Sequence, residues 1–427
     1  MGLLARDAPA IARIKSIISR LMLCGAEVAV PMASFRRERA YLDYNATAPL
    51  RPEARAAMAA AFDLAGNPSS IHAEGRAARA IIEDARRAVA ELAGVGPRGI
   101  VFTSGGTEAA NLALTPTGKA VRLIAGAGEH VCVLSGHRFA PDAATSAPLR
   151  ADGRIDLAAL EAALDAGGPA MLALQAANNE TGVVQPVAEA AALVRARGGI
   201  VVCDAVQLAG RTPLDARALG ADFLILSAHK FGGPKGVGAL IATSSELRPG
   251  SMLLRGGGQE RGARAGTENV AGIAGFGAAA RAAGAGAEGE AVRLAALRDR
   301  LEARIFAAAL DAVVFGDGAP RLPTTTCFAV PGIAAATLLM RFDLAGVAAS
   351  SGSACSSGKV ARSHVLTAMG VAPDLAAGAI RLSLGWASRE ADVELFAEAF
   401  APAVAALRKR RGAASGRANG ARECEGG

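Results

Sequence analysis

Two side chains at the ends of strand-like segments have the types and spacing for chemistry. Lys230 follows the apolar run 223–227 and precedes a glycine-rich turn, and Asp204 closes the apolar run 200–204. Each run predicts a buried strand, and the carboxyl ends of parallel strands open onto one crevice of an α/β sheet. A lysine and an aspartate in one crevice suit pyridoxal 5'-phosphate. The lysine forms a Schiff base, and the aspartate keeps the pyridine nitrogen protonated.

Other interpretations of the lysine segment are weaker or depend on context. A lysine after a strand is usually a solvated turn residue, so Lys230 is convincing only together with other groups. The stretch 232–238 is rich in glycine, but it lacks the four-residue gap and the Lys-Ser/Thr ending of a phosphate-binding loop.

Several further residues have types that would suit the same ligand. Gly106 and Thr107 lie where a predicted strand joins a helix, and a helix N-terminus offers free N–H groups to a phosphate. Ser227 and His229, next to the lysine, have side chains that donate hydrogen bonds. His130 could stack on a planar ring, although a lone histidine is more often structural. The segment 178–180 follows another strand, and an asparagine there is either a ligand or a turn former.

A cysteine and an arginine in the C-terminal third add a second kind of chemistry. Cys355 lies among serines and glycines in 350–358, so we expect an exposed thiol on a flexible loop, suited to a nucleophile that travels between two sites. Lys359 is near enough in sequence to lower its pKa slightly. Arg381 lies in an alternating strand-like segment, where it either binds a substrate carboxylate or forms a structural ion pair.

Strand-like and helix-like segments alternate along most of the chain, which predicts a mostly parallel, doubly wound sheet with helices on both faces. Beyond about residue 288 the pattern becomes mixed, which predicts a smaller α+β domain. Predicted helices cover 52–64, 77–92, 157–164, 187–197 and 291–310, and predicted strands cover 100–103, 123–125, 170–174, 200–204, 223–227, 327–330 and 379–384.

Charge and cysteine content argue against several function classes. The formal charge of +7 comes from the ends, since 1–40 and 408–427 carry +4 each and the rest of the chain carries −1. A basic nucleic-acid-binding face is therefore not supported. The six cysteines form no C-x-x-C pair and no metal-ligand pattern, which predicts a reducing, cytoplasmic compartment and no intrinsic metal site. No apolar run has transmembrane length, so no membrane association is expected.

The two ends of the chain are expected to lie outside the domains. Residues 1–39 are interpreted as an N-terminal extension, with a signal peptide or a true start at Met32 as alternatives. Residues 409–427 predict a disordered tail. We expect a large domain at 54–287, and a small domain formed by 40–53 together with 288–408.

The candidate residues belong to an ordered set of motifs, at 41–47, 67–72, 103–108, 178–180, 204–207, 227–230, 266–269 and 352–355. In type and order this set resembles the NifS/IscS-type cysteine desulfurases of the class V aminotransferase superfamily, over about residues 41–400. The resemblance implies the pyridoxal phosphate-dependent transferase fold of type I.

The resemblance also implies a role for each matched residue. Lys230 would carry the cofactor, Asp204 would pair with its ring nitrogen, His130 would stack on the ring, and Asn179 and Gln207 would bind the phenolate side. The cofactor phosphate would be held by Gly106, Thr107, Ser227, Ala228 and His229, together with Thr267 from the other subunit of a homodimer. Arg381, with Asn179, would bind L-cysteine, and His130 would join Lys230 and Cys355 in catalysis.

The implied reaction removes sulfur from L-cysteine, gives L-alanine, and leaves a persulfide on Cys355. The sulfur would pass to an acceptor protein, such as an iron–sulfur scaffold with which Cys355 could transiently ligate a cluster. A selenocysteine lyase and a class V aminotransferase acting on another small amino acid are alternatives, and a non-catalytic scaffold is a third. Cys355 argues against an aminotransferase, which has no use for it, and the presence of both Lys230 and Cys355 argues against a scaffold.

Overall fold

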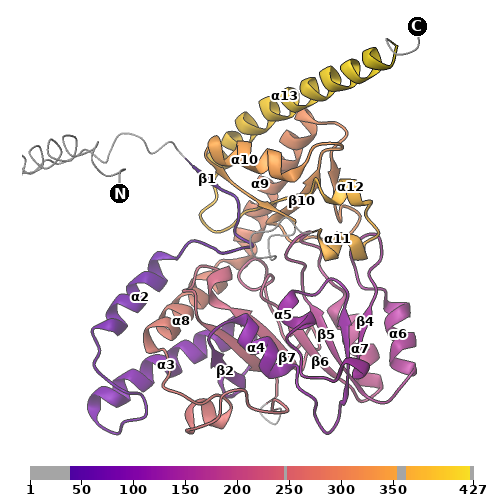
Figure 1. Ribbon diagram of the computed structural model, residues 1–427. Coiled ribbons are helices and arrows are strands. Elements are labelled where there is room, and N and C mark those ends of the chain that lie inside the picture. Colours follow the sequence, from indigo (N-terminus) through magenta and orange to yellow (C-terminus); the bar gives the residue numbers. More distant parts are fainter. Residues whose placement is uncertain (1–38, 245–247, 353–361, 424–427) are drawn as a thin grey trace, which may run out of the picture. The chain divides into compact units, whose positions relative to one another are not determined.

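The computed structural model describes residues 39–244, 248–352 and 362–423 (Figure 1). These residues belong to one compact unit, which begins at Arg39. It contains a seven-stranded sheet, a four-stranded sheet and a two-stranded ladder. In the part of the chain that the structure describes, no helix is long and apolar enough to cross a membrane.

The seven-stranded sheet has the order β2-β8-β7-β6-β5-β3-β4. Its strands are β2 (Ile100–Thr103), β3 (Arg122–Gly126), β4 (Ala144–Ala147), β5 (Ala170–Gln175), β6 (Ile200–Asp204), β7 (Phe223–Ser227) and β8 (Gly238–Ala242). The neighbours from β4 to β7 pair in parallel, whereas β8 is antiparallel to both β7 and β2. The predicted mostly parallel sheet is confirmed, and β8 is an addition that the sequence analysis did not contain.

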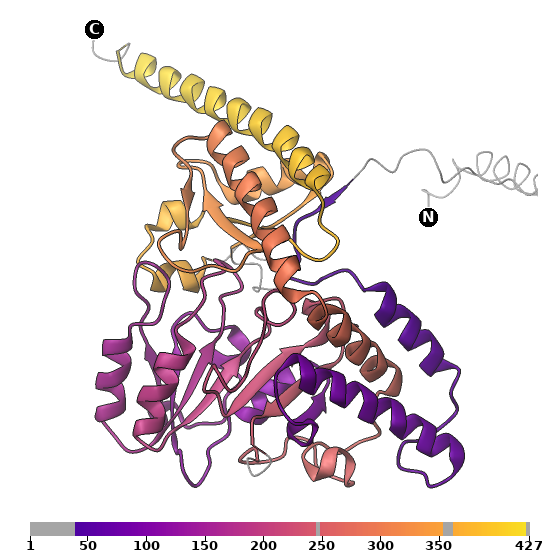
Figure 2. The same ribbon diagram turned by 180° about the vertical axis from the view of Figure 1, so that it is seen from behind.

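Helices cover both faces of this sheet. Successive side chains of its buried strands point to opposite sides, so each face presents apolar side chains that the helices bury. Leu172 and Leu224 belong to the apolar cluster under one set of helices, while Met171 and Phe223 belong to a separate cluster under another. The first set is α3 (Ala73–Leu92), α6 (Leu157–Asp165), α7 (Val187–Ala196) and α8 (Val270–Gly284), and the second is α4 (Gly106–Ala113) and α5 (Val131–Leu134). Helix α2 (Pro52–Phe62) packs beside α8 (Figure 2).

Most predicted elements recur with shifted ends. Strand β2 has the predicted bounds, whereas α3 begins at Ala73 rather than at residue 77. The earlier start follows from a cap that is unusual for its residue type, since the His72 side chain accepts a hydrogen bond from the Gly75 N–H at 3.3 Å.

The second group of elements forms the smaller α+β part of the fold. Its four-stranded antiparallel sheet has the order β12-β13-β10-β9, from Ser350–Ser351, Ile380–Ser383, Thr325–Ala329 and Val313–Val314. Strand β1 (Ala40–Tyr41) pairs in parallel with β11 (Val347–Ala348). The helices are α9 (Ala287–Ala308), α10 (Ala335–Leu344), α11 (His364–Ala368), α12 (Pro373–Ala376) and α13 (Glu390–Glu423).

An apolar cluster of its own stabilises this second group. Phe342 and Phe396 meet edge to face at 5.5 Å, and Phe396 stacks on Phe400 at 5.3 Å, which joins α10 to α13. The segment expected to be a tail differs from the structure, since α13 continues to Glu423. Residues 1–38 and 424–427 lie outside the described residues, and the domain boundaries at 54, 288 and 408 remain predictions.

Candidate active site

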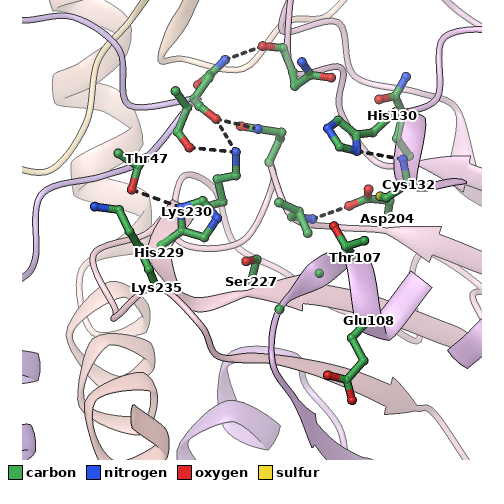
Figure 3. A pocket seen from close by; sticks show the side chains of 18 of the residues that line it. Thr47, Thr107, Glu108, His130, Cys132, Asp204, Ser227, His229, Lys230 and Lys235 are labelled. Atoms are coloured by element: carbon green, nitrogen blue, oxygen red, sulfur yellow. Dashed lines mark hydrogen bonds between the residues drawn. The ribbon is translucent and has the colours of Figure 1, made fainter. Parts of the chain in front are cut away.

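The candidate site lies where the carboxyl ends of β5, β6 and β7 meet. The ladder register places Gln175 beside Asp204 on the neighbouring strand, and β7 ends at Ser227 just before Lys230. A cavity of about 600 Å³ opens at this edge, which is where open α/β sheets bind ligands. Figure 3 shows Lys230, His130 and Asp204 facing this space from different elements.

The structure brings together most of the residues selected from the sequence. Those that line the cavity are Gly106, Thr107, His130, Asn179, Asp204, Gln207, Ser227, His229, Lys230 and Arg381. Ala228 is fully buried beside them and does not line the cavity. Thr267 is exposed and lines a separate, smaller cavity, and Cys355 lies outside the described residues.

The amine of Lys230 is held by main-chain groups from the start of the unit. Its Nζ donates to the carbonyl oxygens of Asn45 at 2.7 Å and Ala46 at 3.0 Å (Figure 3). The side chain of Asn45 in turn donates to the Asn179 carbonyl at 3.0 Å and to Thr325 Oγ1 at 3.0 Å. The motif at 41–47 had no predicted role in the site, so the structure adds these contacts to it.

Asp204 ends β6 and lines the cavity, with most of its carboxyl group buried. Its Oδ1 accepts the Val206 N–H at 2.9 Å. Burial raises the pKa of Asp204 to about 6, although the Val206 hydrogen bond and the charge of Lys230 oppose the shift. Among the described residues Asp204 forms no ion pair, so a cationic partner in the cavity would stabilise its charged form.

Glu129 is a second carboxyl group close to this one, and the sequence analysis gave it no role. It is fully buried, and its Oε1 accepts the Gln175 N–H at 2.8 Å, whereas no partner for its Oε2 is found among the described residues. Burial and the charge of Asp204 raise the pKa of Glu129 well above its ordinary value.

Both histidines of the site are neutral at physiological pH. Burial and, next, the charge of Lys230 lower the pKa of His130 and of His229 to about 4. His130 Nδ1 accepts the Cys132 N–H at 3.2 Å, and His229 Nδ1 lies 3.1 Å from Thr47 Oγ1. A neutral His130 ring facing the cavity is suited to stacking on an aromatic ligand.

Arg381 forms an ion pair, one of the two roles that the sequence left open, and its binding of a substrate carboxylate stays a prediction. Its Nη2 forms an ion pair with Asp43 at 2.7 Å, and its Nη1 donates to the Asn179 carbonyl at 3.1 Å. The remaining Nε is buried, and no partner for it is found in the described part of the chain. Arg381 is 2% exposed and lines the cavity, so a buried donor is available to an anionic ligand.

The end of the cavity at α4 suits an anion. Gly106 begins this helix, and a Cβ placed on it would lie 3.3 Å from Val206 and 3.4 Å from Ser227. The small residue therefore permits close approach of the helix N-terminus to β7. Lys235, which had no role in the sequence analysis, is an exposed cation on the cavity wall.

The loop that presents Thr267 is anchored by a buried ion pair. Arg86 donates to both carboxylate oxygens of Glu260 at 2.8 Å, and the Phe102 N–H donates to Glu260 at 2.9 Å. Glu260 and Arg261 both have positive φ, at 48° and 56°. Thr267 follows this anchored loop, and it is exposed and lines the smaller cavity, which shares Ser104 and Gly236 with the main one.

Comparison with known proteins agrees with this geometry. The model of the class-V aminotransferase family matches residues 40–396. A cysteine desulfurase of Cereibacter sphaeroides is 44% identical over 383 residues, which are 87% of this chain and 97% of the relative. The chain belongs to the class-V aminotransferases, among the cysteine desulfurases. The family expected from the sequence motifs is therefore confirmed.

Solved structures of the family share the fold. A NifS-like protein from Rickettsia africae ESF-5 is 34% identical with a TM-score of 0.79, and the match covers 86% of this chain and 99% of that one. The structure of SspA in complex with cysteine is 29% identical with a TM-score of 0.69, and covers 81% and 98% respectively. The predicted type I fold is confirmed by these likenesses.

Proposed function

We propose that this enzyme removes sulfur from L-cysteine with pyridoxal 5'-phosphate, releases L-alanine and collects the sulfur on Cys355. One observation carries the proposal: Lys230, the carboxyl group of Asp204 and the guanidinium of Arg381 line a single cavity. The desulfurase relatives and the cysteine-bound neighbour support the same substrate.

The residues present fit the cofactor. No ion pair of Asp204 is found in the described part of the chain, and a protonated pyridine nitrogen would supply a cationic partner. His130 is neutral and faces the cavity, and Asn179 and Gln207 line it with side chains that donate hydrogen bonds. Lys230 would hold the cofactor covalently. When bound, the cofactor would supply an electron sink for the substrate Cα.

The phosphate group would lie at the N-terminus of α4, against Gly106, Thr107, Ser227 and His229, with Ala228 behind them. Thr267 is proposed to complete this site in a second copy of the chain, because it is exposed and does not line the main cavity of its own chain. A homodimer is therefore part of the proposal, and a sedimentation experiment that shows only a monomer would contradict it.

Substrate binding is assigned to Arg381 and Asn179. The free Nε of Arg381 would donate to the carboxylate of L-cysteine, while the Asp43 ion pair keeps the guanidinium in place. Once the amine of the substrate has displaced Lys230 from the cofactor, the free Nζ would accept the proton from the substrate Cα, and the carbonyls of Asn45 and Ala46 would hold this amine at the cavity.

The sulfur transfer is assigned to Cys355. Its thiolate forms an S–S bond with the substrate sulfur while the substrate Cβ–S bond breaks. The two electrons that the sulfurs lose reduce Cβ, which takes up a proton to give alanine. Cys203 and Cys327 are poor candidates for this step, because both are buried and burial raises the pKa of each thiol. The persulfide would then pass to an acceptor such as an iron–sulfur scaffold.

The test compares two cysteines. Cys132 also lines the cavity, so Cys132→Ala is the matched control for Cys355→Ala. We expect Cys355→Ala to lose sulfide release from L-cysteine while it keeps the visible absorption of the bound cofactor, and Cys132→Ala to keep both. Lys230→Ala should lose both. Sulfide release by Cys355→Ala at the original rate would refute the assignment.

A further inference from the structure

Glu180 is a buried carboxyl group to which the proposed function assigns no role. It directly follows Asn179 and is 3% exposed, yet it does not line the cavity. Burial raises the pKa of Glu180 to about 7, while a hydrogen bond from Ser363 and the charge of Arg381 oppose the shift. Burial of an ionisable group is unfavourable, so its contacts need an explanation.

One oxygen of Glu180 accepts a hydrogen bond from a residue that is distant from it in sequence. Ser363 Oγ donates to Glu180 Oε2 at 2.5 Å. A Cβ added to Gly352 would lie 3.4 Å from the same Oε2, so Gly352 lies near this carboxyl group. The hydrogen bond that holds Gly352 is donated by its own N–H to the Ala379 carbonyl, at 3.1 Å.

The contact with Ser363 continues into the protein. Ser363 is 3% exposed, and its Oγ accepts the Leu366 N–H at 3.0 Å as the N-cap of α11. Its single hydroxyl proton is therefore directed at Glu180, since the Leu366 N–H uses a lone pair of the oxygen. This arrangement fixes the start of α11 to the Glu180 carboxyl group.

Gly352 and Ser363 stand on either side of the segment that contains Cys355. Cys355 comes three residues after Gly352 in the sequence and eight residues before Ser363. Glu180 itself belongs to the loop after β5, where its N–H donates to Asn178 Oδ1 at 2.9 Å. In that loop the neighbouring Asn179 carbonyl accepts from Arg381.

We propose that Glu180 is a positioning residue, which fixes Ser363, on the C-terminal side of the Cys355 segment, to the loop that contacts Arg381. The inference rests on the proposed function, because this contact matters to the reaction only if Cys355 accepts the sulfur. With the contact in place, the chain that follows the Cys355 segment keeps a fixed position relative to Arg381. Loss of the hydrogen bond between Ser363 and Glu180 slows the sulfur transfer and leaves the cofactor site intact.

The experiment measures the single-turnover rate of persulfide formation on Cys355, by mass spectrometry, in holoenzyme mixed with L-cysteine. Glu180→Ala is expected to slow this rate on the order of 10- to 100-fold, as misplacement of a reacting group does. Its cofactor absorbance and its spectroscopic titration with L-cysteine should match the wild type. Glu189→Gln, an exposed glutamate on α7, is the control and should change nothing.

Ser363→Ala tests the contact from the other side. It should slow persulfide formation as well, and the double variant with Glu180→Ala should be no slower than the slower single variant, because both remove one interaction. Trypsin cleavage after Arg362 gives a readout independent of activity, and it should become several-fold faster in both variants.

The outcomes separate the two proposals. A wild type that forms no Cys355 persulfide would refute the proposed function. If Glu180→Ala forms the Cys355 persulfide at the wild-type rate, and trypsin cleaves it after Arg362 no faster than the wild type, the proposed role of Glu180 is overturned. A variant that also loses cofactor absorbance would overturn it too, because the effect would then be general damage to the site.

Discussion

The two sides of the cavity are built in different ways. On the side of the seven-stranded sheet, Asp204 and Ser227 end neighbouring strands, and continuous ladders fix their spacing. On the other side, the ladders of β13 with β10 and β12 fix the backbone of Arg381, while its guanidinium is held by single contacts to Asp43 and to the Asn179 carbonyl. The first, rigid side places its groups through the backbone, whereas on the second, charged side the position of the guanidinium also depends on side-chain contacts between segments far apart in sequence.

The largest effect should come from the rigid side. Asp204→Asn is expected to lower the rate of sulfide release about 10²- to 10³-fold, because the amide cannot supply the charge that the pyridine nitrogen needs. The rate and the cofactor absorbance would be measured together. Asp215→Asn, at an exposed aspartate, should keep the full rate, and equal rates for the two variants would contradict the assignment of Asp204.

The second prediction concerns Glu180, which feels the charge of Arg381 on the charged side of the cavity and should make the stability of the fold depend on pH. The folded protein raises the pKa of Glu180 from 4.5 to about 7, so the stabilising contribution of its proton is complete below pH 4.5 and is lost as the pH rises through 7. Glu180→Gln removes this dependence. Between pH 5 and pH 8 the wild type should lose up to about 3 kcal/mol more unfolding free energy than the variant.

The wild type and Glu180→Gln both retain Asp204 and Glu129. The raised pKa values of these two groups therefore contribute equally to both stability profiles and do not affect the difference between them. The hydrogen bond from Ser363 and the charge of Arg381 both lower the pKa of Glu180. The charge of Glu180 in turn raises the pKa of the nearby Cys327 thiol. Parallel stability profiles for the wild type and Glu180→Gln, measured by chemical unfolding, would contradict the prediction.

A milder change on the charged side is Arg381→Lys. Lysine keeps the charge but loses the planar fork and the free Nε, so the KM for L-cysteine should rise about 10- to 100-fold, the value of one or two charge-assisted hydrogen bonds. Cofactor absorbance should not change. An unchanged KM would show that the carboxylate binds elsewhere.

The smallest effect should come from Lys235. It is exposed on the cavity wall, so Lys235→Ala should weaken cofactor binding only about two- to fivefold, as exposed charges do. The difference should disappear as salt is raised. A fluorescence titration with the cofactor at two ionic strengths measures both, and a loss that persists in high salt would indicate a direct contact.

Local sequence patterns were sufficient for the rigid side. Apolar runs that end in Asp204 and Lys230 predicted both the strands and the crevice, because strand ends of a parallel sheet converge by geometry alone. Strand β8 was not predicted, since its apolar run is short and lies in a glycine-rich stretch. Its antiparallel direction also has no local signal in the sequence.

The charged side could not be predicted in the same way. The acceptors of Lys230 are the backbone carbonyls of Asn45 and Ala46. Every residue has a backbone carbonyl, so residue type does not indicate which of them accepts a hydrogen bond. The contact of Glu180 with Ser363 joins residues 183 positions apart, so only the folded chain reveals it. The motifs at 41–47 and 178–180 were visible, but their partners were not.

The use of backbone acceptors for Lys230 has a consequence for how the site tolerates change. No substitution at position 45 or 46 deletes a carbonyl, so side-chain identity affects the alignment of the amine only indirectly, through the contacts by which the Asn45 side chain holds its own backbone, whereas chain length affects it directly. An insertion between β1 and Thr47 would shift both acceptors at once, since β1 is registered on β11 and Asn45 is tied to Thr325. The spacing of this segment, more than its composition, is what variation must preserve.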